Sequence, residues 1–210
     1  EHRQSILRSS FKGGRIVSID FNALEARVLL YEAGRMCDGT DLYGSLSGEL
    51  GFDRRSVKGA VISELYGQSK VALGATLGIE GKKLDEFVKS VKAHFNTREL
   101  LKRIKKDFIA TGAIKNRYGR PIVIDEPMDH IMISYSAQST GVDVALMGFK
   151  AVLDRLAHLV PLVRAVYVLH DALLLDVHPD AFDAVSSITT VNVPGYVQRF
   201  FLKHETIHQQ

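Results

Sequence analysis

The chain has 210 residues, of which 46% are hydrophobic and 24% are charged, and its formal net charge is +3. This composition is typical of a globular protein with one large or two small domains. No apolar run reaches the ~20 residues needed to span a bilayer, so no membrane partner is expected. The single cysteine, Cys37, excludes an internal disulfide framework and favours a reducing compartment such as the cytoplasm.

The first predicted elements are a strand and a helix. The strand-like segment "RIVSID" covers residues 15–20. Leu24, Val28 and Leu29 then form the apolar face of a helix that Gly34 ends. The pattern further predicts a helix over 54–66, an apolar periodic segment over 70–79, and basic amphipathic helices over 82–95 and 97–110.

The second half of the chain mixes strands with one long helix. The predicted elements are two short strands within 112–124, a helix buried on several sides over 129–159, a hairpin over 164–179, and a last strand over 195–205. The order of strands and helices indicates an α+β fold with a helical insertion.

Positive charge is concentrated in one segment. Residues 80–120 contain 12 Lys/Arg and 5 Asp/Glu, a net charge of +7, whereas the remainder contains 15 and 19, a net charge of −4. This separation favours a polyanion bound at the basic segment and metal-binding carboxylates elsewhere. Solvated basic helices explain the charge alone equally well.

Two aspartates lie at the ends of predicted strands. Asp20 ends the first strand, and Asp171 sits at the turn of the hairpin. Neighbouring antiparallel strands would bring the two carboxylates together, and hard oxygen ligands suit Mg²⁺. Taken singly, Asp20 is better explained as a helix cap and Asp171 as a turn residue.

A stripe of four residues runs along the helix predicted over 54–66. Arg54, Lys58, Ile62 and Tyr66 recur every four residues, so they drift by only about 40° per step around the helix, and Gly67 follows. A solvated face joined to a core face explains such a stripe when it stands alone. Beside two metal-binding carboxylates, however, it suits a triphosphate.

Several segments together resemble family A DNA polymerases, the DNA polymerase I-like group. The resemblance covers nearly all of the chain and rests, in order, on "DFNALEARVL", "RRSVKGAVISELYG", "NRYGRPI", "SAQSTGVDVA" and "VLHDALLLDVH". It implies a polymerase palm, an antiparallel sheet with packed helices, over 1–35 and 113–210. It also implies an inserted helical fingers subdomain over 36–112. On this resemblance, the family's thumb is expected to be absent from this chain.

The resemblance implies an activity and its partners. The chain would add deoxynucleotides to a DNA primer–template by two-metal phosphoryl transfer. An upstream segment or a separate chain would supply the thumb and exonuclease. Asp20, Asp171 and the Phe21 carbonyl would bind two Mg²⁺ ions, with Mn²⁺ as a substitute.

The resemblance also implies roles for the remaining site residues. Those contacting the nucleotide would be Arg54 and Lys58 at the triphosphate, Tyr66 near the templating base, Glu25 against a ribose 2′-hydroxyl, and Ile62 and Tyr43. Those contacting DNA would be Arg27, Gly67, Arg120, Gln138 and His170.

The chain departs from the family pattern at several of these positions. Ile62 replaces an aromatic residue, Ala172 replaces the glutamate after the catalytic aspartate, and Tyr43 replaces a histidine. Ser134 and His130 replace the usual Asn and Arg. Three alternatives stay open: a single-subunit phage-type RNA polymerase fragment, a catalytically weakened DNA-binding relic, and a metal-dependent nuclease.

Overall fold

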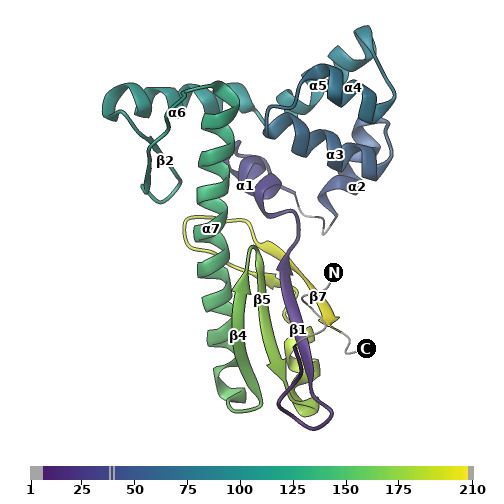
Figure 1. The fold of residues 1–210 in the computed structure, drawn as a ribbon, viewed down its shortest axis with the longest axis vertical. Helices are drawn as coiled ribbons and strands as arrows, with labels where there is room; N and C mark the ends of the chain where they lie inside the picture. Colours follow the sequence, from purple (N-terminus) through teal and green to yellow (C-terminus); the bar gives the residue numbers. More distant parts are fainter. Residues whose placement is uncertain (1–6, 38, 40, 208–210) are drawn as a thin grey trace. The chain divides into compact units, whose positions relative to one another are not determined.

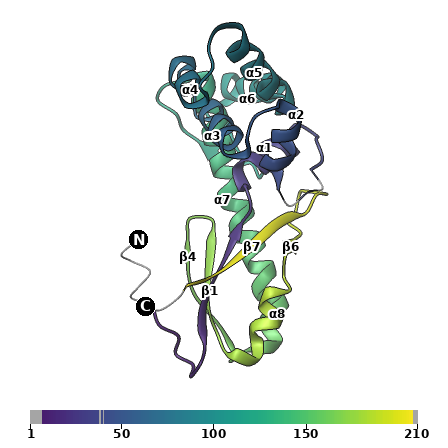
Figure 2. The same cartoon turned by 90° about the vertical axis from the view of Figure 1, so that its right-hand side faces the viewer.

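The computed structural model describes residues 7–37, 39 and 41–207, and the chain divides into two compact units. The sheet unit contains the residues up to Leu24 and those from Val142 onward. The helical unit contains Glu25–Gly141. Figures 1 and 2 show the elements of both units.

The sheet unit is built on a five-stranded antiparallel sheet in the order β4-β5-β1-β7-β6. Its strands are β1 (Arg15–Phe21), β4 (Val163–Leu169), β5 (Ala172–Val177), β6 (Thr190–Val191) and β7 (Phe200–Ile207). The first strand of the chain therefore lies in the middle of the sheet. The short helix α8 (Phe182–Ser186) joins β5 to β6.

One face of the sheet packs against the C-terminal part of the long helix α7 (Asp129–Leu156). The Phe21 and Phe149 rings lie 5.3 Å apart, and a Cβ atom at Gly148 would come within 2.6 Å of the Phe21 ring. Gly148 is therefore required for this close approach. Since side chains alternate along a strand, the opposite face carries Asp20 and the residues opposite it on β5 and β7.

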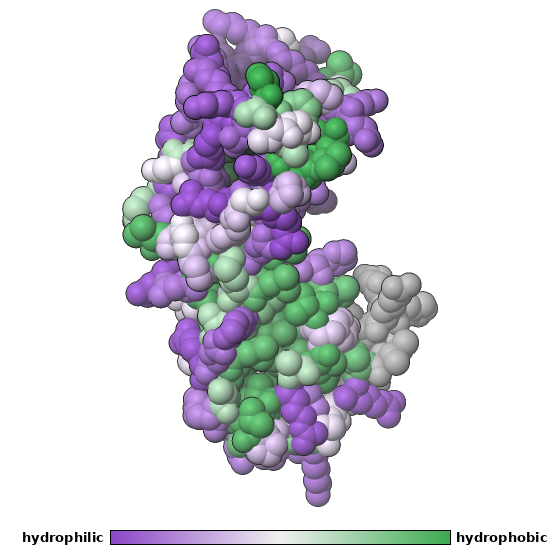
Figure 3. All heavy atoms as spheres, turned by 90° about the vertical axis from the view of Figure 1, so that its left-hand side faces the viewer, coloured by the Kyte–Doolittle hydropathy of each residue, from purple (hydrophilic) through white to green (hydrophobic). Residues whose placement is uncertain are grey.

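The edge strand β4 is unusually exposed for its composition. Val166, Tyr167, Val168 and Leu169 are each two fifths to one half exposed, and Val142 and Leu146 on α7 are slightly more than half exposed. Figure 3 shows apolar residues gathered over this part of the molecule. An edge strand presents unpaired backbone groups on its outer side, so β4 offers both backbone and apolar contacts.

A two-residue turn joins β4 to β5. Leu169 pairs with Ala172, so His170 and Asp171 form the whole connection. His170 adopts φ +54, the left-handed conformation that tight hairpin turns require. The sequence predicted the turn at this position, and the structure confirms it.

The helical unit contains most of the helices. They are α1 (Leu24–Glu32), α2 (Leu42–Leu50), α3 (Arg54–Leu65), α4 (Lys70–Leu77), α5 (Gly81–His94), α6 (Thr97–Thr111) and the N-terminal part of α7. A small hairpin, β2 (Ile114–Lys115) and β3 (Pro121–Ile122), follows α6. Helices α5 and α6 bury Leu84, Phe87, Val91 and Ile104 and expose their lysines.

The α+β class is confirmed, and the differences concern single elements. Helix α2, helix α8 and strand β6 were not predicted, and the last strand begins at Phe200 instead of residue 195. Among the described residues, no helix is long and apolar enough to cross a membrane. The division into palm and fingers, with boundaries after residues 35 and 112, stays a prediction, and residues 1–6 of that palm lie outside the described residues.

Candidate functional site

The sheet unit brings the two predicted catalytic aspartates together. Asp20 on β1 pairs directly with Ala172 on β5, so Asp171 is the next residue beyond that pair. The Phe21 amide donates a 3.2 Å hydrogen bond to the Asp171 carbonyl, which ties the hairpin turn to the end of β1. Three residues predicted as metal ligands therefore meet at one end of the sheet, and His170 lies exposed in the adjoining turn.

The electrostatics of this cluster reflect two carboxylates and one lysine. Desolvation and the neighbouring Asp20 carboxylate raise the pKa of Asp171, while Lys203 and His170 oppose the rise. Lys203 lies opposite Asp20 on β7, and its Nζ is 2.7 Å from Asp20 Oδ2. The hydrogen bond to Asp20 raises the pKa of Lys203. Sequence reasoning missed Lys203, because the register of β7 decides its position.

The donor set of this cluster fits magnesium. Asp20 and Asp171 supply carboxylate oxygens, and Mg²⁺ is usually held by one or two carboxylates with water and substrate phosphates completing its shell. Among the described residues, no group of three or more His, Cys, Asp or Glu side chains could hold a metal ion. With alanine at position 172, this end of the sheet carries the carboxylates of Asp20 and Asp171.

In the helical unit, three predicted residues from distant segments meet at one hydroxyl. Tyr66, just beyond α3, donates a hydrogen bond to Glu25 on α1. The side chain of Gln138 on α7 also hydrogen-bonds Tyr66. Desolvation and the bond to Glu25 raise the pKa of Tyr66 to about 12. The neutral phenol thus holds the Glu25 carboxylate, a role that an aliphatic Ile62 cannot perform.

Arg54 begins the predicted stripe and is held by a residue that the sequence did not single out. Arg54 Nε lies 2.7 Å from Asp41 Oδ2, and Asp41 also caps helix α2 by accepting from the Gly44 amide. This pairing lowers the pKa of Asp41. Lys58 is exposed one turn further along α3. An Asp before an unrecognised helix was the only available signal for Asp41.

Two of the predicted contact residues, Tyr43 and Arg27, are buried in the helical unit. Tyr43 is buried in α2, and desolvation raises its pKa to about 12, so its hydroxyl stays neutral. Arg27 is 0% exposed, and its guanidinium donates to the carbonyls of Gly39 and Cys37. Arg27 thus binds backbone carbonyls that follow α1, and the predicted contacts of Tyr43 with the nucleotide and of Arg27 with DNA stay predictions.

Gly67 ends the stripe with a close contact to α7. It adopts φ +73, and a Cβ atom there would come within 2.3 Å of the His130 ring. Both the backbone conformation and the missing space require glycine. His130, which stands where the family has arginine, therefore packs directly against the end of the stripe, and Ser134 is buried one turn further along α7.

The turn carrying Arg120 is docked on α7. The Asn116 side chain accepts hydrogen bonds from the Tyr118 and Arg120 amides and donates to the Ser139 carbonyl. Asn116 is buried, whereas the Arg120 side chain is exposed. The motif "NRYGR" thus combines an internal asparagine that shapes the turn with an arginine available at the surface.

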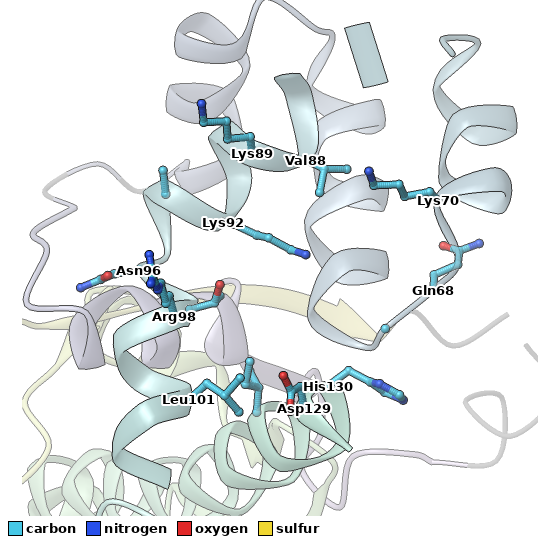
Figure 4. Close-up of a pocket in the computed structure, with 14 residues that line it drawn as sticks. Gln68, Lys70, Val88, Lys89, Lys92, Asn96, Arg98, Leu101, Asp129 and His130 are labelled. Carbon is cyan, nitrogen blue, oxygen red and sulfur yellow. The ribbon is translucent and has the colours of Figure 1, made fainter. Parts of the chain in front are cut away.

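A basic groove of about 760 Å³ lies within the helical unit. Its lining includes four cations, Lys70, Lys89, Lys92 and Arg98, and a single carboxylate, Asp129. Figure 4 shows Lys92 extending across the groove, with Asp129 and His130 at the N-terminal end of α7. Gly67 and Gln68 also line it, so the groove begins where the stripe ends. The basic segment and Gly67 were predicted, but the four lining cations were not singled out.

The chain resembles a known polymerase domain in structure. No protein-family model matches its sequence. Among solved structures, it matches the POL domain of Pol1 from M. smegmatis, solved in complex with DNA primer-template and dNTP. The TM-score is 0.65 at 15% sequence identity, and the match covers 91% of this chain but 39% of that one. The chain therefore has an α+β fold similar to part of a Pol1 polymerase domain.

Proposed function

We propose that this chain is the palm and fingers of a template-directed DNA polymerase that adds deoxynucleotides to a primer 3′ end. The observation that carries the proposal is the pairing of Asp20 with the strand that follows Asp171, at one end of a sheet with a polymerase-like fold. The palm would lie over 1–35 and 113–210 and the fingers over 36–112. Because the chain spans 39% of the matched structure, further residues or a separate chain would supply the thumb.

Asp20 and Asp171 would hold the catalytic ions. When bound, two Mg²⁺ ions activate the attacking 3′-hydroxyl and stabilise the leaving pyrophosphate. The strands keep the two carboxylates at adjacent register positions, and the Phe21–Asp171 backbone bond prevents the turn from drifting away. Such preorganisation is what phosphoryl transfer mainly requires of a protein, since positioning and charge stabilisation dominate its catalysis.

The helical unit would handle the incoming nucleotide. Arg54 and Lys58 are exposed cations on one stripe of α3 and would bind phosphate oxygens. Tyr66 holds the Glu25 carboxylate, and a carboxylate held in place can exclude a ribose 2′-hydroxyl. This contact favours deoxynucleotides over ribonucleotides and thus favours a DNA polymerase over an RNA polymerase.

The basic groove would bind single-stranded template. Its four cations could neutralise successive phosphates of an extended strand. Exposed Arg120 and half-buried Gln138 would add contacts to the duplex, as the resemblance implies.

Primer extension tests the proposal directly. The chain, alone and together with its upstream or partner polypeptide, is incubated with a primer–template, Mg²⁺ and either deoxy- or ribonucleotides. Extension by deoxynucleotides that EDTA abolishes is expected. Preferential extension by ribonucleotides would favour the RNA polymerase alternative. Primer shortening without extension would favour a nuclease. DNA binding without either reaction would leave a DNA-binding relic.

A further inference from the structure

Lys203 occupies an unusual position beside the carboxylate pair. On the open face of the sheet, the strand register places Lys203 on one side of Asp20 and Ala172 on the other. Its ammonium lies 2.7 Å from Asp20 Oδ2, a direct charged hydrogen bond. A cation supplied by the chain itself is therefore in direct contact with this Asp20 oxygen.

The arrangement of the pair allows the Lys203 ammonium to leave Asp20. The Lys203 side chain is 61% exposed, whereas that of Asp20 is 22% exposed. Exposed ion pairs are weak, because water solvates the separated charges well and holding a long lysine side chain in one place costs conformational entropy. Asp171 and His170 lie at the hairpin turn beside Asp20, and Glu205 lies two residues along β7 on the same face as Lys203. Asp171 and Glu205 offer the ammonium other carboxylates when it leaves Asp20.

We propose that Lys203 is a tethered cation that competes with divalent metal ions for Asp20. An ammonium in contact with the carboxylate repels a second cation at the same oxygen, so an ion binds Asp20 only after Lys203 turns toward solvent. Lys203 is thus a positioning residue that weakens ion binding before substrate arrives. The inference rests on the proposed metal site at Asp20 and Asp171.

A purely structural role makes a different prediction. Cross-strand Lys–Asp pairs also stabilise sheets, and in that case removing Lys203 would lower thermal stability without strengthening ion binding. Ion affinity, measured without nucleotide or DNA, therefore separates the two roles.

The experiment titrates the full chain with Mn²⁺ and follows the free ion by electron paramagnetic resonance. The variants are Lys203→Met, Lys203→Arg, Asp20→Asn and Lys150→Met, the last removing a lysine paired at 2.6 Å with Asp154 on α7. Lys203→Met should bind Mn²⁺ about tenfold more tightly than the wild type, because an opposing charge near the ion is gone. Lys203→Arg and Lys150→Met should stay within about twofold of the wild type.

The outcomes separate this inference from the proposed function. Unchanged or weaker Mn²⁺ binding by Lys203→Met, with binding lost in Asp20→Asn, would overturn the competition alone. Equal binding by the wild type and Asp20→Asn would overturn both the metal site and the competition. If Lys203→Met lowers thermal stability, Lys203→Gln, which keeps a polar side chain without the charge, should show the same tighter binding.

Discussion

Asp20 in the sheet unit and Arg54 in the helical unit each form an ion pair at 2.7 Å, but their surroundings differ. Asp20 is 22% exposed, and strands on both sides determine its neighbours. Arg54 is 53% exposed, and its partner Asp41 is 49% exposed. A sheet register holds a carboxylate in place before any ligand arrives, whereas a cation on a helix surface can follow a ligand. This difference suits metal ligands on the sheet and phosphate ligands on the helix.

The largest expected effect on activity comes from changing the aspartates that the sheet holds in place. Asp20→Asn or Asp171→Asn should lower the rate of nucleotide addition by about 10³-fold or more, because a metal ligand is lost. Single-turnover extension measures the rate, and affinity for duplex DNA should remain within about twofold. Asp154→Asn, an exposed aspartate on α7, serves as the control. Extension by either mutant within tenfold of the wild type would contradict the assignment.

Changing a cation on the surface of helix α3 should have a smaller effect, which is specific for the incoming nucleotide. Lys58→Ala should lower kcat/KM for the incoming nucleotide by about 10²-fold, since one phosphate contact is lost, with little change in DNA affinity. Steady-state extension and DNA titration measure the two quantities. Lys82→Ala, another exposed lysine of the helical unit, should change neither. Equal losses in both quantities would place Lys58 at the template instead.

The basic groove is a third kind of surface, which we expect to bind single-stranded DNA through its charge. Changing Lys89, Lys92 and Arg98 to Gln should weaken binding of a short single-stranded DNA by about 30-fold at low salt. The slope of the logarithm of the binding constant against the logarithm of salt concentration should also become less steep by about two, as the loss of three phosphate contacts predicts. The matched control changes Lys82, Lys102 and Lys106, which lie on the same two helices outside the groove lining. Equal losses in both triple variants would mean that net charge matters and the groove does not.

The smallest effect concerns sugar choice. Glu25→Ala should reduce discrimination against ribonucleotides by about tenfold, and Tyr66→Phe, which removes the hydroxyl that bonds Glu25 and Gln138, by about threefold. Ile62→Phe should increase discrimination against ribonucleotides. The measurement is the ratio of kcat/KM for matched deoxy- and ribonucleotides. An unchanged ratio in Glu25→Ala would show that this carboxylate does not face the sugar.

Much of the fold was predictable because apolar runs and charged ends mark its elements. Strand β1 and the hairpin turn at His170 were predicted correctly. Helix α2 was not, because "LYGSLSGEL" contains two glycines and two serines, which are weak helix formers. Its stability depends on the Asp41 cap and on Gly51, which ends it with φ +72.

The site was predictable where a residue's own segment determines its position. The alternation along β1 and the hairpin turn placed Asp20 and Asp171 at strand ends, and helical spacing placed Arg54 and Lys58 on one stripe. Lys203 was not predictable, because alternation along β7 gives its face but the pairing with β1 gives its neighbour. The burial of Arg27 likewise depends on a partner beyond its own helix, the Gly39 carbonyl that it hydrogen-bonds.

The exposed edge strand β4 has a practical consequence for work with the isolated chain. Four consecutive apolar residues, Val166–Leu169, lie on an unpaired edge, and aggregation commonly begins at such edges. The register shift between Ala165 and Tyr167 is a local irregularity of β4 that makes pairing with another strand at this edge less favourable. Light scattering of the purified chain should therefore rise with concentration. A lysine at Val168, an exposed edge position, should improve solubility before any enzymatic property is measured.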